Sequence, residues 1–201
     1  MNGALYDWIL SQAERSILGP LRERLLRPLA GRIVEVGAGT GADFVHYDRP
    51  AHVLALEPDP AMAARARRRA ADASATIELR VADDRWLDML PAGSVDAVVF
   101  PLVLCTVHEV AVTLARAHRV LHSSGKIVVL EHVRSAGTLG RVQDAMTPAW
   151  RIIAGGCHLN RDTAATVAAA GFDIRHLQER RLPWFSPVQR LVAGAAYPRQ
   201  A

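Results

Sequence analysis

The chain has 201 residues, of which 50% are hydrophobic and 22% are charged. This balance fits one globular domain and excludes a disordered or fibrous chain, and the small net charge of +4 argues only weakly for an anionic partner. Lys126, the only lysine, lies in a predicted turn, so we do not expect Schiff-base catalysis.

The first part of the chain predicts a helical cap. Residues 4–29 have the pattern of one or two helices, and Gly19 and Pro20 interrupt it as strong local breakers. We therefore assign residues 1–30 to an N-terminal cap on a single domain that spans residues 1–201.

Short apolar runs then alternate with longer helical patterns. The five runs are residues 33–36, 52–56, 76–81, 95–100 and 126–133. This βαβ rhythm predicts a parallel sheet of the α/β class. The runs are apolar throughout, which is typical of strands that helices cover on both faces.

The last third of the chain predicts two helices and two more strands. The helices are residues 139–153 and 161–170, and Gly171 ends the second. The strands are residues 172–178 and 190–197, which would complete the sheet.

The cysteines and the hydropathy pattern exclude several other classes. Cys105 and Cys157 cannot form a disulfide framework, and no cysteine or histidine cluster has metal-ligand spacing, so no metal is expected. The N-terminus does not resemble a secretory signal. The longest nearly apolar stretch, residues 97–107, is too short to cross a bilayer. We expect a cytoplasmic protein without a stable membrane anchor.

A glycine-rich loop follows the first predicted strand and opens a helical stretch. Gly37, Gly39 and Gly41 allow a sharp turn and close approach of a ligand to the backbone. Free N–H groups at the start of a helix would bind a polar or anionic group. A plain tight turn is the alternative explanation.

Acidic residues follow the second and third predicted strands. Glu57 is placed to accept hydrogen bonds from the ribose hydroxyls of a nucleoside, and Asp83 is placed to meet the adenine amino edge. A single such acid is often only a helix cap. Acids after several neighbouring strands favour a nucleoside site.

Two adenosine cofactors fit this pattern. Gly37, Gly39 and Ala42 also satisfy the dinucleotide fingerprint. Against a dinucleotide, Gly41 fills a position that the fingerprint leaves free, Glu35 would repel a pyrophosphate, and no Tyr-x-x-x-Lys pair is present. A cationic sulfonium with an amino-acid tail suits these surroundings better.

At this point the chain resembles the class I S-adenosylmethionine-dependent methyltransferases. The likeness is carried by residues 35–41, Glu57, Asp83 and residues 94–107. It implies S-adenosyl-L-methionine as cofactor and a Rossmann-like, seven-stranded, mostly parallel sheet with its last strand antiparallel. Ligands in such a fold bind at the carboxyl ends of the strands.

The resemblance also implies a cofactor site. Its residues would be Glu35, Gly37, Ala38, Gly39, Gly41, Glu57, Pro58, Asp83, Asp84, Pro101 and Leu102. The glycine loop and Glu35 would surround the methionine portion, and Glu57 would hold the ribose. Asp83 and the backbone around Asp84 would frame adenine, while Pro101 and Leu102 would lie near the transferable methyl.

A closer likeness points to the acceptor. Residues 101–107, 130–133, 148–150 and 156–161 resemble the alkyl thiol S-methyltransferase branch and its short bacterial relatives. This resemblance implies methyl transfer to a small lipophilic thiol. The chain departs from the animal members in lacking their N-terminal hydrophobic anchor, which puts membrane attachment in doubt.

Candidate residues for the acceptor side are few. His132, at the end of the fifth predicted strand, and His158 are candidate general bases, although each also fits a structural histidine. Cys105, Trp150 and Cys157 are candidate pocket residues. Covalent catalysis by either cysteine is not expected, because free cysteine is usually a small buried hydrophobe.

Other functions stay open on the sequence alone. The main alternative is O- or C-methylation of a phenol or quinone, and a noncatalytic module that binds adenosine or nucleic acid ranks below it. The basic run Arg65, Arg67, Arg68 and Arg69 is expected to be a solvated helix face and not a nucleic-acid site. The sequence does not define the oligomeric state.

Overall fold

The computed structural model describes residues 17–182 and 188–199. The strands are β1 (Gly31–Val36), β2 (Ala51–Leu56), β3 (Thr76–Arg80), β4 (Val95–Pro101), β5 (Leu121–His132), β6 (Phe172–Asp173), β7 (Gln178–Arg181) and β8 (Arg190–Pro198). The α-helices are α2 (Gly19–Leu26), α3 (Pro60–Ala70), α4 (Val110–Val120), α5 (Gly137–Ile153) and α6 (Thr163–Ala169). Two short 3-10 helices are η2 (Phe44–His46) and η3 (Asp84–Met89).

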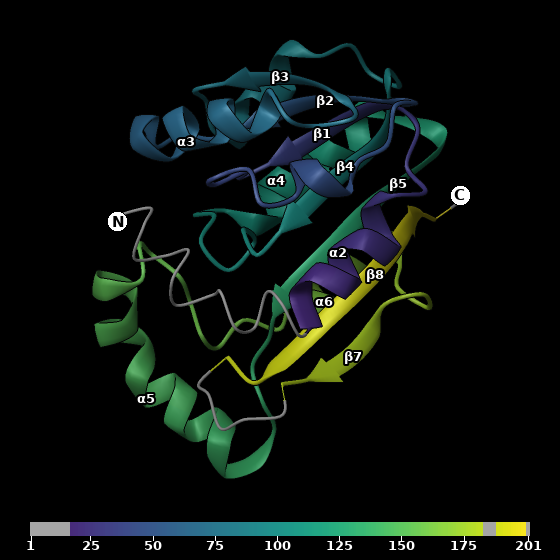
Figure 1. Ribbon diagram of the computed structural model, residues 1–201. Helices are drawn as coiled ribbons and strands as arrows, with labels where there is room; N and C mark the ends of the chain where they lie inside the picture. Colours follow the sequence, from purple (N-terminus) through teal and green to yellow (C-terminus); the bar gives the residue numbers. More distant parts are fainter. Residues whose placement is uncertain (1–16, 183–187, 200–201) are drawn as a thin grey trace.

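The strands form one mixed sheet in the order β3-β2-β1-β4-β5-β8-β6, with β7 also paired to β8 (Figure 1). Strands β1 to β5 are parallel, and β8 runs antiparallel to β5. This arrangement confirms the predicted Rossmann-like α/β class with an antiparallel last strand. The sheet has eight strands, however, and not the seven that were predicted.

The extra strand arises because the predicted strand at residues 172–178 is interrupted. The Asp173 carboxylate accepts a hydrogen bond from the Arg175 backbone N–H at 3.0 Å, and Leu177 N–H donates to the Ile174 carbonyl at 2.9 Å. These bonds turn the chain out of the sheet after β6. It returns as β7, which pairs with the first part of β8, while β6 pairs with the last part.

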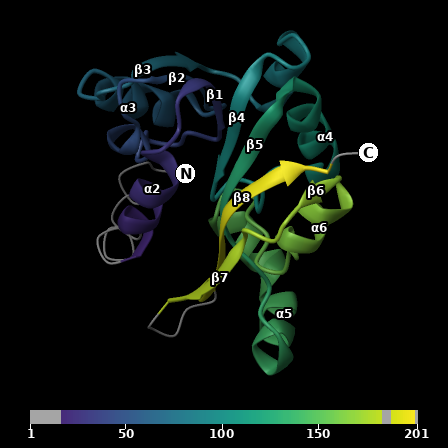
Figure 2. The same cartoon turned by 90° about the vertical axis from the view of Figure 1, so that its right-hand side faces the viewer.

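Helices cover both faces of the sheet, with α2 and α3 on one side and α4 and α6 on the other (Figure 2). Strand β4 shows the consequence for its side chains. Val98 and Phe100 pack in the core cluster that includes α4, whereas Ala97 and Val99 pack in the cluster that includes α3. Burial on both faces is what the uninterrupted apolar runs predicted.

The predicted cap is described only from residue 17 onward, so most of residues 4–29 lie outside the described residues. Because residues 1–16 lie outside the described part of the chain, the interruption predicted at Gly19 and Pro20 stays a prediction. These two residues are the first of α2, where proline is tolerated because the first N–H groups of a helix have no intrahelical partner. Helix α2 packs through Leu21 against Leu130 and Leu191 of the sheet.

Candidate functional site

The glycine loop follows β1 at the carboxyl ends of the parallel strands, where the neighbouring strand β4 also ends. Gly37 and Gly41 adopt φ values of +74° and +80°, and a Cβ on Gly37 would clash with the side chain of Val103. A Cβ on Gly39, at φ +58°, would meet no other atom within 4 Å, so this side of the loop faces open space. A ligand can therefore approach the backbone at Gly39, as the sequence predicted.

The segment after the loop differs from the prediction. Instead of an α-helix, turns lead from Gly39 into the short 3-10 helix η2. Gly41 N–H donates to the Ala38 carbonyl at 2.9 Å, which tightens the turn before a helical end can form. The N–H groups of Gly37, Ala38, Gly39 and Gly41 all donate to acceptors within the protein, so the predicted row of free N–H groups at a helix start is not present in this loop.

Glu57 lies directly over this loop. Its Oε2 accepts a hydrogen bond from Gly39 N–H, and its Oε1 accepts one from Asp59 N–H, both at 2.8 Å. Burial raises the pKa of Glu57, although these two backbone bonds oppose the shift. Pro58, the next residue, is exposed. Each carboxylate oxygen keeps a second lone pair for a ligand hydroxyl.

The two acids after β3 have different partners. Asp83 caps η3 and forms an ion pair with Arg85 at 2.6 Å, and this pairing lowers its pKa. Asp84 accepts a hydrogen bond from Thr113 Oγ1 at 2.6 Å and pairs with Arg116 at 2.8 Å, both on α4. The Asp84 carboxylate therefore connects η3 to α4.

Glu35 is fully buried beneath the loop. Tyr47 Oη donates to its Oε2 at 2.7 Å, while Oε1 has no hydrogen-bond partner among the described residues. Burial, reinforced by nearby Asp43, raises its pKa well above the usual range. A buried acceptor without a partner is costly, and an ammonium group of a ligand would satisfy it.

The loop after β4 is held in an uncommon shape. Leu102 adopts φ +57°, rare for a residue with a side chain, and its N–H donates to the Leu130 carbonyl at 2.7 Å. Val103 and Leu104 N–H both donate to Oε1 of Glu131, which burial gives a pKa of about 7. Glu131 was not among the residues that the sequence predicted for the site.

Arg161 fixes the far end of the same loop. Its guanidinium donates to the carbonyl oxygens of Leu104 and Val107. A half-buried arginine that binds backbone carbonyls has no local sequence pattern, which is why sequence reasoning missed it. Together with Glu131, Arg161 holds the loop after β4 in place.

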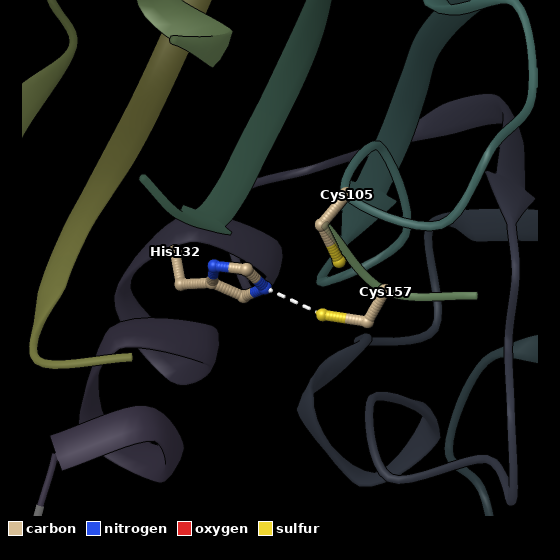
Figure 3. A group of neighbouring side chains, drawn as sticks. All are labelled: Cys105, His132 and Cys157. Atoms are coloured by element: carbon tan, nitrogen blue, oxygen red, sulfur yellow. Dashed lines mark hydrogen bonds between the residues drawn. The ribbon is translucent and has the colours of Figure 1, made fainter. Parts of the chain in front are cut away.

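Cys105, His132 and Cys157 converge beside this loop (Figure 3). His132 Nε2 lies 3.0 Å from Cys157 Sγ, and the three side-chain donor atoms all lie within 4.8 Å of one another. Trp150 Nε1 also donates to Cys157 Sγ at 3.4 Å. The structure thus brings together four predicted acceptor-side residues that come from three separate segments.

The close contacts shift the pKa values of these groups. The neighbouring Cys105 thiol and the His132 ring lower the pKa of Cys157, while the same contact with Cys157 and burial raise the pKa of Cys105. Burial alone would lower the pKa of His132, but the adjacent Cys157 outweighs burial and raises it. Cys157 is therefore the thiol of the cluster that ionises first.

His158 points elsewhere. Its Nδ1 lies 3.1 Å from the carbonyl oxygen of Cys105, and its backbone N–H donates to the same oxygen at 2.9 Å. Burial lowers the pKa of its ring. His158 thus connects the segment after α5 to the loop after β4 without contacting the sulfur atoms.

Comparisons with known proteins agree with this architecture. A family model described as a methyltransferase domain matches residues 34–129. The chain is 28% identical over 183 residues to the human thiol S-methyltransferase TMT1A, covering 89% of this chain and 75% of that protein. It is 34% identical over 192 residues to the ubiquinone/menaquinone biosynthesis C-methyltransferase UbiE of Methylobacterium nodulans, covering 91% of this chain and 71% of that protein.

A solved structure extends the likeness to the whole fold. A SAM-dependent methyltransferase from Thermotoga maritima, described as a possible histamine N-methyltransferase, aligns with a TM-score of 0.63 at 18% identity. The alignment covers 99% of this chain and 100% of that one.

The chain belongs to the class I S-adenosylmethionine-dependent methyltransferases, as the sequence resemblance implied. It is an enzyme whose cofactor is S-adenosylmethionine, and its similarity extends to thiol S-methyltransferases. The open face of Gly39 and the unpartnered oxygen of Glu35 fit this cofactor. Within residues 17–182 and 188–199, no helix combines the length and apolarity that crossing a bilayer requires.

Proposed function

We propose that this enzyme transfers the methyl group of S-adenosylmethionine to the sulfur of a small lipophilic thiol. The observation that carries this proposal is the cluster of Cys105 and His132, at the carboxyl ends of β4 and β5, with Cys157 from the segment after α5. Two buried groups, the Cys105 thiol and the His132 imidazole, and the half-buried Cys157 thiol make a site that suits a soft, weakly hydrated nucleophile. The similarity to a protein named thiol S-methyltransferase supports the same acceptor class.

The cofactor side is assigned from the contacts around the loop. Glu57 would bind the ribose hydroxyls through the lone pairs that Gly39 and Asp59 leave free. Glu35 would accept a hydrogen bond from the ammonium group of the methionine portion through its unpartnered Oε1. Asp83 and the backbone at Asp84 would frame adenine at the end of β3.

The methyl would then lie at the end of β4, next to Pro101 and Leu102. Methyl transfer is an in-line displacement, so the protein contributes mainly by aligning the acceptor sulfur and excluding water. A free thiol has a pKa of about 8.5, and a nearby sulfonium charge favours its thiolate form. His132 and His158 are the candidates to take the proton, and the geometry favours His132 because its ring faces the sulfur atoms.

A second acceptor class has its own support. The similarity to a ubiquinone/menaquinone C-methyltransferase favours a phenol or quinone-like ring as acceptor. Such an acceptor would not need the sulfur groups of the cluster. The two hypotheses therefore differ in which small molecules gain a methyl group.

The deciding experiment is a substrate panel. The full chain is incubated with methyl-labelled S-adenosylmethionine and alkyl thiols, sulfide, phenols or quinols, and the products are identified by mass spectrometry. We expect labelled methyl thioethers from the alkyl thiols. Exchange of Glu57 for alanine is the matched control, since it should reduce all transfer by weakening cofactor binding. Labelled phenol ethers or ring-methylated quinols without any thioether would contradict the thiol assignment.

A further inference from the structure

We propose that Cys105, His132 and Cys157 bind one thiophilic divalent cation, with zinc as the expected ion, and leave a fourth position open to the acceptor thiol. No metal was expected from the sequence, because these residues are far apart along the chain. The fold brings two sulfurs and one imidazole nitrogen together, which is a ligand set of the kind that catalytic zinc sites use.

The distances fit a tetrahedral site. Zinc–sulfur bonds of about 2.3 Å and a zinc–nitrogen bond of about 2.0 Å place tetrahedral ligands about 3.5 to 3.8 Å apart. Here His132 Nε2 and Cys157 Sγ are 3.0 Å apart, and no pair among the three donor atoms exceeds 4.8 Å. Small side-chain rotations would bring all three into the range for one ion.

The backbone around the ligands is already fixed. Glu131 holds the loop that carries Cys105, and His158 N–H binds the Cys105 carbonyl next to Cys157. Trp150 donates to Cys157 Sγ, a contact that orients the sulfur. Such supporting bonds are what metal ligands need to keep their geometry.

Charge and burial also favour a cation. Cys105 is 2% exposed and His132 is 5% exposed, so ionised thiols would be costly there without a counter-charge. Two thiolates, a neutral imidazole and a divalent ion have no net charge. When Nε2 binds the ion, the ring proton of His132 must lie on Nδ1, a buried atom without a partner among the described residues, so this ligand lacks the acceptor that usually supports a metal-bound histidine.

The open position gives the proposed reaction its activated nucleophile, and this step rests on the proposed thiol methylation. The acceptor thiol binds the ion as a thiolate and releases its proton to solvent, so His132, which binds the ion through Nε2, takes no proton when the metal is present. A sulfur lone pair then forms the new S–CH₃ bond while the bond from the methyl carbon to the cofactor sulfonium breaks. The electron pair of that bond stays on the cofactor sulfur. The uncharged thioether is a weak ligand and leaves.

The metal site is tested without any turnover. The full chain is prepared with reductant, its zinc content is measured by mass spectrometry, and the metal-free protein is titrated with cobalt(II). We expect one metal per chain, with thiolate-to-cobalt charge-transfer bands and the intense visible bands of tetrahedral cobalt. Absence of these bands in the wild-type protein overturns the proposal, and so does a Cys105–Cys157 disulfide in the reduced sample.

Variants identify the ligands. Cys105→Ala and Cys157→Ala should each weaken cobalt affinity by about tenfold or more and diminish the charge-transfer bands, because each removes one thiolate. His122→Ala is the matched control, since it removes an exposed histidine at the start of β5 and should leave the spectrum unchanged. Unchanged cobalt binding in both cysteine variants overturns the assignment. The wild-type titration remains decisive if a variant does not fold.

A final titration tests the open position. Adding an alkyl thiol to the cobalt protein should shift the visible bands, whereas an alcohol of the same size should not. If the cobalt protein shows the expected tetrahedral and charge-transfer bands but no thiol shifts them, the proposal of an open coordination position is wrong. If thiols shift the spectrum but the substrate panel gives no methyl thioether, the metal site stands and the proposed acceptor is wrong.

Discussion

Replacing Glu57 with alanine tests the cofactor site directly. The carboxylate accepts Gly39 N–H and Asp59 N–H at 2.8 Å each, and a Cβ on Gly39, its hydrogen-bond partner, would meet open space. Losing charged hydrogen bonds to the ribose hydroxyls should weaken binding of S-adenosylhomocysteine by about 1 to 3 kcal/mol, roughly 5- to 150-fold in Kd. Isothermal titration calorimetry measures this change.

The measurement must separate ribose binding from support of the loop, since Glu57 does both. Adenosine and an analogue that lacks both ribose hydroxyls provide the comparison. Wild-type protein should prefer adenosine, and Glu57→Ala should remove that preference. Glu78→Ala is a matched control, because it deletes an exposed carboxylate on neighbouring β3 whose contact is a surface pair with Arg80.

Two results would refute this reasoning. Unchanged affinity for S-adenosylhomocysteine in Glu57→Ala would mean that the ribose does not contact this carboxylate. An equal loss for adenosine and for the analogue without hydroxyls would mean that Glu57 acts only by holding the glycine loop.

Three further predictions follow from buried groups at the site. Glu35→Gln should make the protein more stable than the wild type, and increasingly so as pH rises. The folded-state pKa of Glu35 is raised above its unfolded value, so ionisation of this buried carboxyl lowers wild-type stability between the two pKa values. Urea unfolding from about pH 5 to about pH 8 should show the difference in unfolding free energy between variant and wild type widen. Gly37→Ala should lower the melting temperature more than Gly39→Ala, because only the first adds a Cβ that would clash with Val103, whereas the second should mainly weaken cofactor binding. Glu131→Ala should cost about 1 to 3 kcal/mol in unfolding free energy per backbone N–H left without a partner, which denaturant titration measures.

Much of the sheet could be predicted because burial on both faces leaves a clear pattern. The positions of β1 to β4 were predicted, and the apolar character is clearest in β4, whereas β3 alternates between exposed and half-buried residues at the edge of the sheet. The βαβ rhythm predicted that these strands are parallel but not their order in the sheet. Strand β5 starts earlier than predicted because Leu121 pairs with Val95 of β4, after which an irregularity precedes the regular pairing from Lys126. The break between β6 and β7 depends on a local turn at Asp173, which an apolar pattern does not reveal.

The cofactor side and the acceptor side of the proposed site also differ in how far the sequence predicted them. The cofactor half consists of residues at the ends of consecutive strands, so chain order alone places Gly39 next to Glu57. The acceptor half depends on long-range packing, because His132 and Cys157 are separated by 25 positions in the sequence. The sequence named these residues singly, because each adjoins a strand end or a family-like segment, but nothing in their spacing showed that they meet.

The loop after β4 connects these two halves. Val103 packs so closely on Gly37 that no side chain fits there, and two residues later Cys105 carries a sulfur of the acceptor cluster. Glu131 fixes the first part of this short path by binding the backbone N–H groups of Val103 and Leu104. A shift of the backbone at Gly37 would therefore press on Val103, two residues before Cys105, because the close contact leaves little room to absorb it.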